Sequence, residues 1–311
     1  MRKAAVIGIG SNSVRMLVAQ IEEDGFTRLT RDREGTRLFA GLDEQRNLNR
    51  QSMEKTAAAV RRMADSAARI GCGDVRIFAT SASRDARNGS EFLKMIREET
   101  GRELEIISGE EEAVLSFLGA TEAAPPGTPC GVIDIGGGST EIVTGRGREI
   151  FSAVSCQMGA VRLFRLFAIE RKEDMAAVEF AAREILKEQW PPAPFRENGS
   201  AAQALLPKTW IGTGGTFTAL AALVRDIPWT DRRFMHGTRL PLARIREVGE
   251  RLADMTVEER LKMESIQPGR ADIVVHGICI LLAVMDTIGI GEIIVSEYGN
   301  LDGYLRDRYC G

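Results

Sequence analysis

The chain has 311 residues, which exceeds the size of one typical hydrophobic core and suggests two domains. Its 44% hydrophobic and 27% charged residues are ordinary for a soluble globular protein, and a net charge of −3 excludes a global attraction to nucleic acid or membranes. Five cysteines without a Cys-x-x-Cys pair or zinc spacing, and no visible targeting segment, lead us to expect a cytoplasmic protein.

Apolar and β-branched runs in the first half of the chain predict strands. They lie at Ala4–Ile9, Val14–Ile21, Phe26–Phe39, Val75–Ala79 and Leu104–Ile107. Amphipathic helices are expected over Ser52–Ile70 and Glu91–Thr100, because each has an apolar stripe or ends at a glycine. A further helix begins at Ser108, which as N-cap places Glu111 at the third helical position of a capping box.

Three prolines within residues 123–129 break the periodicity and mark the best candidate domain boundary. We therefore expect domains at 1–122 and 123–311, with a C-terminal tail that can pack back on the first domain. The second half predicts strands at Val132–Ile135, Ile142–Thr144, Ile150–Ser155, Leu205–Gly212 and Glu292–Ser296, and a loop at 195–204. Its helices are expected at Gly159–Leu166, Asp174–Gln189, Leu242–Met255, Val257–Met263 and from Pro268 to Met285, the last too short to span a bilayer.

Three glycine-rich turns follow strands. The most informative is Val132-Ile-Asp-Ile-Gly-Gly-Gly-Ser-Thr-Glu141, a predicted hairpin whose tip can cradle an anion with backbone N–H groups and two hydroxyls. Asp134 and Glu141 lie at its rim, where a divalent cation could bridge them to a phosphate. The alternative is a plain glycine-rich hairpin with solvated acids.

The same pattern occurs at Val6-Ile-Gly-Ile-Gly-Ser-Asn-Ser13-Val-Arg15, which overlays the first stretch without a gap and indicates a duplicated architecture. A third turn, Trp210-Ile-Gly-Thr-Gly-Gly-Thr216, precedes a helix start and suits an anion at a helix N-terminus. No lysine follows the glycines, so none of the three is a Walker loop.

Five blocks in order resemble the exopolyphosphatase and guanosine pentaphosphate phosphatase family of the actin-like ATPase and sugar-kinase superfamily. They are Gly10-Ser-Asn-Ser-x-Arg15, Ala79-Thr-Ser-Ala-Ser-Arg84-Asp-Ala-Arg-Asn88, Ser108-Gly-Glu-Glu-Glu112-Ala113, the Asp134 loop and the Gly212–Thr216 loop. The resemblance runs from about residue 4 to residue 303. It implies an α/β fold of two ribonuclease-H-like (actin-like ATPase) domains with an interdomain cleft.

The resemblance also implies roles for individual residues. Glu112 activates the attacking water, and Arg84 clamps phosphate oxygens with its planar fork of donors, although each could instead be a surface group. Asp134 and Glu141 hold Mg²⁺ or Mn²⁺. The expected phosphate-binding residues are Gly10, Ser11, Asn12, Ser13, Arg15, Gly136, Gly137, Gly138, Ser139, Thr140, Gly212, Thr213, Gly214, Gly215 and Thr216.

The expected activity is hydrolysis of terminal phosphoanhydride bonds of inorganic polyphosphate, guanosine pentaphosphate or both. Nucleic-acid and membrane partners are not expected, guanosine tetraphosphate is a further candidate ligand, and a homodimer is one assembly that the sequence leaves open. Arg270 and Asp272 match family positions as structural or site-edge groups, and His276 is expected to be a core histidine.

The chain departs from the family pattern at two places. Gly8 stands where the family, and the internal repeat through Asp134, have an aspartate that helps to place the cation. The tail reads Gly299-Asn-Leu301-Asp302-Gly303 where the family has Gly-Leu-Arg-Glu-Gly. A catalytically silent binding protein therefore stays open, as does a nucleotide-dependent kinase, and Gly8→Asp is expected to raise activity or lower the Mg²⁺ requirement.

Overall fold

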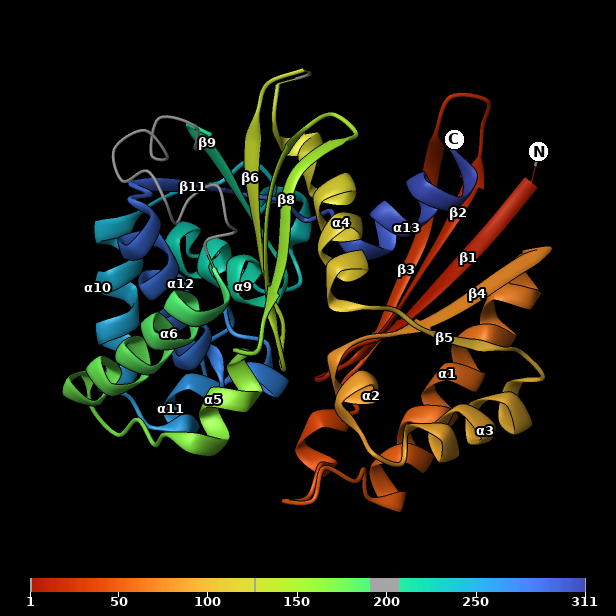
Figure 1. Ribbon diagram of the computed structural model, residues 1–311, viewed down its shortest axis with the longest axis horizontal. Coiled ribbons are helices and arrows are strands. Elements are labelled where there is room, and N and C mark those ends of the chain that lie inside the picture. The colour runs from red at the N-terminus through yellow and green to blue at the C-terminus, as the bar shows by residue number, and fades with distance from the viewer. Residues whose placement is uncertain (1, 126, 191–206, 311) are drawn as a thin grey trace. The chain divides into compact units, whose positions relative to one another are not determined.

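The computed structural model describes residues 2–125, 127–190 and 207–310, and these form two compact units (Figure 1). The first unit comprises the chain up to Gly119 and the segment from Asn300 onward, and the second unit is Ala120–Gly299. The sequence placed the boundary after residue 122 and left the position of the tail open. In the structure, the C-terminal helix belongs to the first unit.

The sheet of the first unit has the order β3-β2-β1-β4-β5. Its strands are β1 (Arg2–Ile9), β2 (Val14–Ile21), β3 (Phe26–Glu34), β4 (Asp74–Ala79) and β5 (Leu104–Ile106). The first three strands are antiparallel, whereas β4 runs parallel to β1 and β5 parallel to β4. The strand expected over Phe26–Phe39 is too long, because the backbone of Arg37 turns left-handed (φ 55°) and a 3-10 turn follows at Leu38–Gly41.

Helices cover both faces of this sheet. They are α1 (Arg50–Ile70), α2 (Ser81–Asp85), α3 (Gly89–Thr100), α4 (Gly109–Ala120) and α13 (Asn300–Tyr309). Helix α1 confirms its prediction: the side chain of Asn49 caps its first turn, and Gly71 ends it in the left-handed conformation. The core under α13 contains Val6, Leu17, Phe78, Leu301 and Tyr304.

The sheet of the second unit has the order β10-β11-β9-β6-β7-β8. Its strands are β6 (Cys130–Ile135), β7 (Thr140–Arg146), β8 (Glu149–Cys156), β9 (Thr209–Thr213), β10 (Arg239–Pro241) and β11 (Glu292–Val295). Again an antiparallel meander of three strands comes first, and β9 runs parallel to β6. The repeat in the sequence is therefore a repeat of topology, and the expected α/β fold of two ribonuclease-H-like domains is confirmed.

The helices of the second unit enclose its core. They are α5 (Ala160–Leu166), α6 (Met175–Gln189), α9 (Gly215–Arg225), α10 (Leu242–Ala253), α11 (Val257–Leu261) and α12 (Val274–Ile288). Short 3-10 turns lie at Thr121–Ala123, Lys172–Asp174, Arg232–Phe234 and Pro268–Arg270, so the helix expected from Pro268 begins later, at Val274. The loop expected at 195–204 and the first two residues of the strand expected at Leu205–Gly212 lie outside the described residues.

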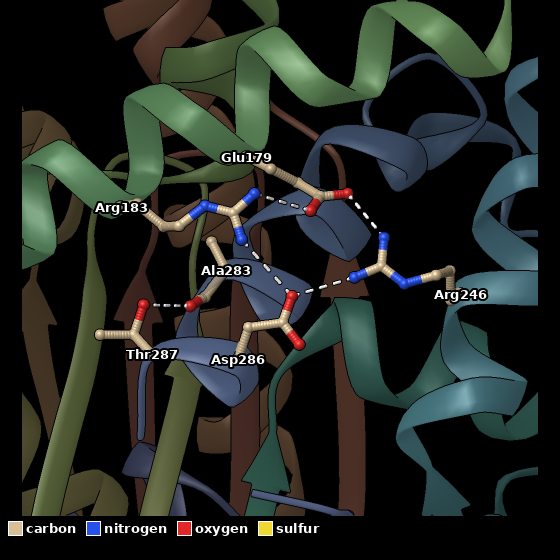
Figure 2. A network of polar contacts seen from close by, with 6 residues as sticks. All are labelled: Glu179, Arg183, Arg246, Ala283, Asp286 and Thr287. Atoms are coloured by element: carbon tan, nitrogen blue, oxygen red, sulfur yellow. Dashed lines mark hydrogen bonds and ion pairs between the residues drawn. The ribbon is translucent and has the colours of Figure 1, made fainter. Parts of the chain in front are cut away.

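Helix α12 is the centre of this core, since almost all of its side chains are buried. In the described part of the chain, no helix combines the length and apolar character needed to cross a bilayer. A ring of four charged residues connects α12 to α6 and α10 (Figure 2). Arg183 and Arg246 each contact both Glu179 and Asp286, at nitrogen–oxygen distances of 3.0–3.4 Å. Each cation has two acidic neighbours, so the ring can fix the three helices in register.

Candidate functional site

The predicted residues of the first unit gather at one edge of its sheet. The first loop, the second block and the Glu112 helix follow β1, β4 and β5, whose parallel arrangement places their carboxyl ends together. The N–H of Gly10 closes the first loop by donating to the carbonyl of Ser13 at 3.0 Å. The hydroxyls of Ser11 and Ser81 lie 2.8 Å apart, which connects this loop to the second block.

Glu112 and Arg84 are brought into contact. Glu112 lies in the first turn of α4 and is only 7% exposed. Arg84 Nη1 lies 3.3 Å from Glu112 Oε2 and donates to the carbonyl of Ile107 at 3.0 Å. Among the described residues, the buried Nη2 of Arg84 has no hydrogen-bond partner. The arrangement leaves an unused guanidinium donor beside a buried carboxylate.

The neighbouring Glu111 is structural. Its N–H donates to Ser108 Oγ at 3.0 Å, which confirms Ser108 as the cap of α4. Its carboxylate accepts from Arg308 of α13 at 2.9 Å. Glu111 and Glu112 therefore have separate surroundings although they are adjacent in the sequence.

Arg15 points toward the α13 side of the first sheet, where its Nη2 donates to Asn300 Oδ1 at 3.0 Å. Arg33 lies directly opposite Arg15 on β3, and its Nε donates to Ser13 Oγ at 3.2 Å. Asn12 and Ser13 are both almost fully buried. The first loop is thus bordered by two guanidinium groups.

Gly8 lies against α13. A Cβ atom at this position would lie 2.9 Å from Leu301 Cδ2 and 3.1 Å from Phe78 Cζ. The two positions that depart from the family pattern, Gly8 and Leu301, therefore lie against each other. An aspartate at position 8 requires a shift of the Leu301 side chain, so the predicted effect of Gly8→Asp on activity depends on that neighbour.

The second loop repeats the turn of the first. The N–H of Gly136 donates to the carbonyl of Ser139 at 3.0 Å, as Gly10 does to Ser13. The carbonyls of Gly136 and Gly137 accept from the first N–H groups of α5, and that of Gly138 accepts from Arg162 Nε at 2.7 Å. Of the two hydroxyls expected at the tip, that of Thr140 donates to the carbonyl of Met158 at 2.5 Å. The hydroxyl proton of Thr140 is therefore already used within the second unit.

Asp134 and Glu141 face each other across β6 and β7, since they are register partners in the antiparallel pair. Both are buried, with 8% and 1% of their surface exposed. Ser155 Oγ donates to Glu141 Oε1 at 2.8 Å. Two buried carboxylates placed directly opposite repel each other, and a divalent cation held by them would reduce this repulsion. The donor set fits Mg²⁺, which commonly takes one or two protein carboxylates and completes its shell with water and phosphate oxygens.

The third loop lies beside Asp134. Gly214 has φ +93°, and a Cβ atom there would lie 2.6 Å from Asp134 Oδ1. This position therefore requires glycine both for its backbone and for the approach of the carboxylate. Thr213 Oγ1 donates to the carbonyl of Tyr298 at 2.7 Å, while Thr216 packs against Gly277 of α12.

Each unit thus assembles its own share of the predicted residues. The first unit groups Gly10, Ser11, Asn12, Ser13, Arg15, Arg84 and Glu112. The second unit groups Asp134, Gly136, Gly137, Gly138, Ser139, Thr140, Glu141, Gly212, Thr213, Gly214, Gly215 and Thr216. The roles that the resemblance implies for these residues stay predictions.

Sequence reasoning gave too little weight to two arginines. The guanidinium of Arg270 lies on Gly215 at the start of α9, so close that a Cβ there would overlap it. The sequence predicts Arg33 only as part of the strand expected at Phe26–Phe39. The signal that could have found Arg33 is its register against Arg15, and register requires the pairing of β2 with β3.

Histidine and cysteine do not contribute a metal centre in the described chain. His276 is 2% exposed and its Nε2 lies 2.9 Å from the carbonyl of Phe167, which confirms it as a core residue. Burial lowers the pKa of His276 below its ordinary value. Within the described ranges, no group of three or more His, Cys, Asp or Glu side chains could hold a metal ion. The Asp134–Glu141 pair stays the predicted cation site, with water or substrate oxygens as the further ligands.

Comparison with known proteins places these features in a family. The Ppx/GppA phosphatase family matches residues 17–309. Exopolyphosphatase 2 of Mycobacterium tuberculosis is 33% identical over 318 aligned positions, which cover 97% of each chain. The solved PPX-GPPA enzyme of Aquifex aeolicus is 28% identical with a TM-score of 0.80 over 99% of both chains. A solved exopolyphosphatase of Cytophaga hutchinsonii is 26% identical with a TM-score of 0.85, over 98% of this chain and 96% of that one.

The family match and the relatives span nearly the whole chain, both units included. On this evidence, the chain belongs to the Ppx/GppA phosphatase family.

Proposed function

We propose that this protein hydrolyses the terminal phosphoanhydride bond of inorganic polyphosphate, guanosine pentaphosphate or both, and releases orthophosphate. Membership of the Ppx/GppA phosphatase family and the similarity to exopolyphosphatases support this class of reaction. The single observation that carries it is the buried Glu112 carboxylate held 3.3 Å from Arg84, whose second amino group has no hydrogen-bond partner among the described residues.

Glu112 is the general base of the proposal. Its place in the first turn of α4 favours the ionised carboxylate, because the amino end of a helix carries partial positive charge. Arg84 holds this carboxylate with Nη1 and offers Nη2 to a phosphoryl oxygen. One side chain therefore orients the base and also binds the group that is attacked.

The glycine loops bind the remaining phosphoryl oxygens with backbone N–H groups and hydroxyls. Asp134 and Glu141 hold Mg²⁺ or Mn²⁺, which when bound offsets the negative charge of the phosphate chain. These two carboxylates come from neighbouring strands of one hairpin, so their separation is fixed by the sheet.

The reaction balances without another reactant. A water molecule gives a proton to Glu112 while its oxygen attacks the terminal phosphorus in line, and the bond from that phosphorus to the bridging oxygen breaks. The bridging oxygen stays with the shortened chain, and the proton returns to solvent from Glu112. Positioning and electrostatic stabilisation supply most of the acceleration in such transfers.

The test is Glu112→Gln, assayed by release of free phosphate from tripolyphosphate and from guanosine pentaphosphate over a series of Mg²⁺ and Mn²⁺ concentrations. We expect kcat to fall about 10²–10⁴-fold with little change in KM, because a general base contributes that much to the rate. Glu111→Gln is the matched control, since the same substitution one residue away removes a contact to Arg308 and no reacting group. Normal turnover by Glu112→Gln contradicts the assignment of the base.

A binding protein without turnover is the second candidate. It is favoured by one observation: Leu301 and Phe78 occupy the space in which a side chain at position 8 would lie, so β1 contributes no carboxylate there. Tight binding of tripolyphosphate without phosphate release, in both Mg²⁺ and Mn²⁺, supports this candidate over the hydrolase.

A further inference from the structure

The two equivalent hairpins carry opposite charges. Asp134 and Glu141 are register partners in the second unit, and the internal repeat places Gly8 and Arg15 at the corresponding positions of the first unit. The hairpin of the second unit therefore presents two carboxylates, whereas that of the first presents a guanidinium. A hairpin of this charge suits phosphate oxygens directly and does not suit a cation.

A second arginine strengthens this contrast. Arg33 on β3 is the register partner of Arg15 on β2, so the two side chains lie on the same face of the sheet. Like charges directly opposite each other in an antiparallel pair are destabilising. Arg33 is oriented toward the loop, because its Nε donates to Ser13 Oγ at 3.2 Å. Both guanidinium groups border the first loop, so each can donate to a phosphate group bound there.

A buried hydroxyl without a partner lies next to the same loop. Thr36 is 3% exposed, and among the described residues its Oγ1 has no hydrogen-bond partner. The following residue, Arg37, donates its N–H to the carbonyl of Asn12 at 3.0 Å, so this segment lies against the loop. A buried hydroxyl that stays unpaired is unfavourable, and an oxygen of a bound ligand can pair with it.

The backbone of this segment is also held in an uncommon conformation. Arg37 has φ 55° and ψ 42°, a left-handed geometry that is unfavourable for a residue with a side chain. It is maintained by the bond to Asn12 and by a second bond from the N–H of Phe39 to the carbonyl of Ser11 at 2.9 Å. The loop and the segment are thus fixed to each other, and Thr36 is fixed with them.

We propose that Arg33 and Thr36, together with Arg15, form a second phosphate subsite in the first unit. It binds a phosphate group that follows the terminal one, so the substrate class is a run of consecutive phosphates. This deepens the proposed function and rests on it. Inorganic polyphosphate and the triphosphate of guanosine pentaphosphate share this chemistry, and the experiment includes both.

The experiment measures binding by calorimetry to Glu112→Gln protein, so that hydrolysis does not consume the probe. Adding Arg33→Gln is expected to weaken binding of tripolyphosphate about 10–100-fold, because a charge-assisted hydrogen bond is removed, and to leave binding of orthophosphate unchanged. Arg33→Lys is expected to recover part of the loss, and Thr36→Val to weaken tripolyphosphate binding to a smaller extent. Guanosine pentaphosphate, as the second probe, shows whether its phosphates use the same subsite.

Arg2→Gln is the matched control. Arg2 is an exposed arginine of the same sheet at the opposite end of β1, paired with Asp74 at 3.0 Å, and its substitution is expected to leave binding unchanged. Tripolyphosphate affinity that is unchanged in Arg33→Gln, or an equal loss of orthophosphate binding, overturns the subsite. Absence of phosphate release by the wild-type protein overturns the proposed hydrolysis instead, while the binding result still decides the subsite.

Discussion

The contact between Gly8 and Leu301 makes the sharpest prediction about this fold. Gly8→Asp adds a side chain whose Cβ would lie 2.9 Å from Leu301 Cδ2 and 3.1 Å from Phe78 Cζ. Phe78 is fully buried and stacks on Tyr304 with ring centroids 5.0 Å apart, so it has little freedom to move. Leu301 meets the new side chain with Cδ2, the far end of its own side chain.

The expected cost follows from overpacking. Inserting atoms into a packed core costs about 1–3 kcal/mol, and the carboxylate gains back only about 0.2–1 kcal/mol from Arg15 directly opposite. Leu301→Ala alone is expected to cost about 2–5 kcal/mol, because it leaves a cavity. In the double variant the new side chain fills that cavity. The destabilisation of the double variant should therefore be smaller than the sum of the two single destabilisations by about 1 kcal/mol or more, within the range that contacting residues show.

The assay must report on the first unit alone. Trp190, Trp210 and Trp229 all belong to the second unit, so tryptophan fluorescence follows the wrong part of the molecule. Hydrogen exchange of peptides from β1 and β2 over a denaturant series measures the stability of the first unit. Gly73→Asp is the control, because a Cβ at this exposed glycine meets nothing within 4 Å. Costs for Gly8→Asp and Leu301→Ala that add within about 0.5 kcal/mol would refute the contact.

Three further predictions concern the second unit. Glu179→Gln removes the buried carboxylate that Arg183 and Arg246 share, so the free energy of unfolding should fall by about 1–3 kcal/mol. Denaturant unfolding followed by tryptophan fluorescence measures this change, and an unchanged midpoint means that the ring does not stabilise the fold. Burial lowers the pKa of His276, so as pH falls below about 6.5 the unfolded chain binds a proton before the folded chain does. The free energy of unfolding should therefore decline there by up to about 1.4 kcal/mol per pH unit, and His276→Gln should flatten this decline. Gly214→Ala should weaken Mn²⁺ binding, measured by calorimetry without substrate, because its Cβ would displace the Asp134 carboxylate. Gly237→Ala is the control: its φ is +75° and a Cβ there meets nothing within 4 Å, so it should affect stability alone.

Much of the architecture could be predicted from local sequence. The gapless overlay of the Val6 and Val132 stretches predicts two equivalent hairpins, and the structure confirms both, down to the same Gly-to-Ser hydrogen bond in each turn. Consecutive glycines between two β-branched runs do not continue a helix, so a turn between two strands is the expected structure. The cap at Ser108 could also be predicted, because it depends only on residues within one turn of helix.

Helix α13 was not predictable in this way. Its sequence is strongly charged, and the residues that it buries against the sheet are stabilised by Phe78 and Arg28, which are far away in the chain. The end of β3 was also misplaced, because the turn at Arg37 depends on bonds to the loop at Ser11–Ser13 and not on local preference.

The sequence by itself determined which residue types could do the chemistry: the glycine turns, the paired acids and the glutamate at a helix start. Only the tertiary structure decided which of them meet. Strand register placed Asp134 opposite Glu141 and Arg15 opposite Arg33, and the return of α13 filled the space beside Gly8 with Leu301. The physical reason is that composition and spacing act within a few residues of the chain, whereas contacts between strands and helices depend on how distant segments pack.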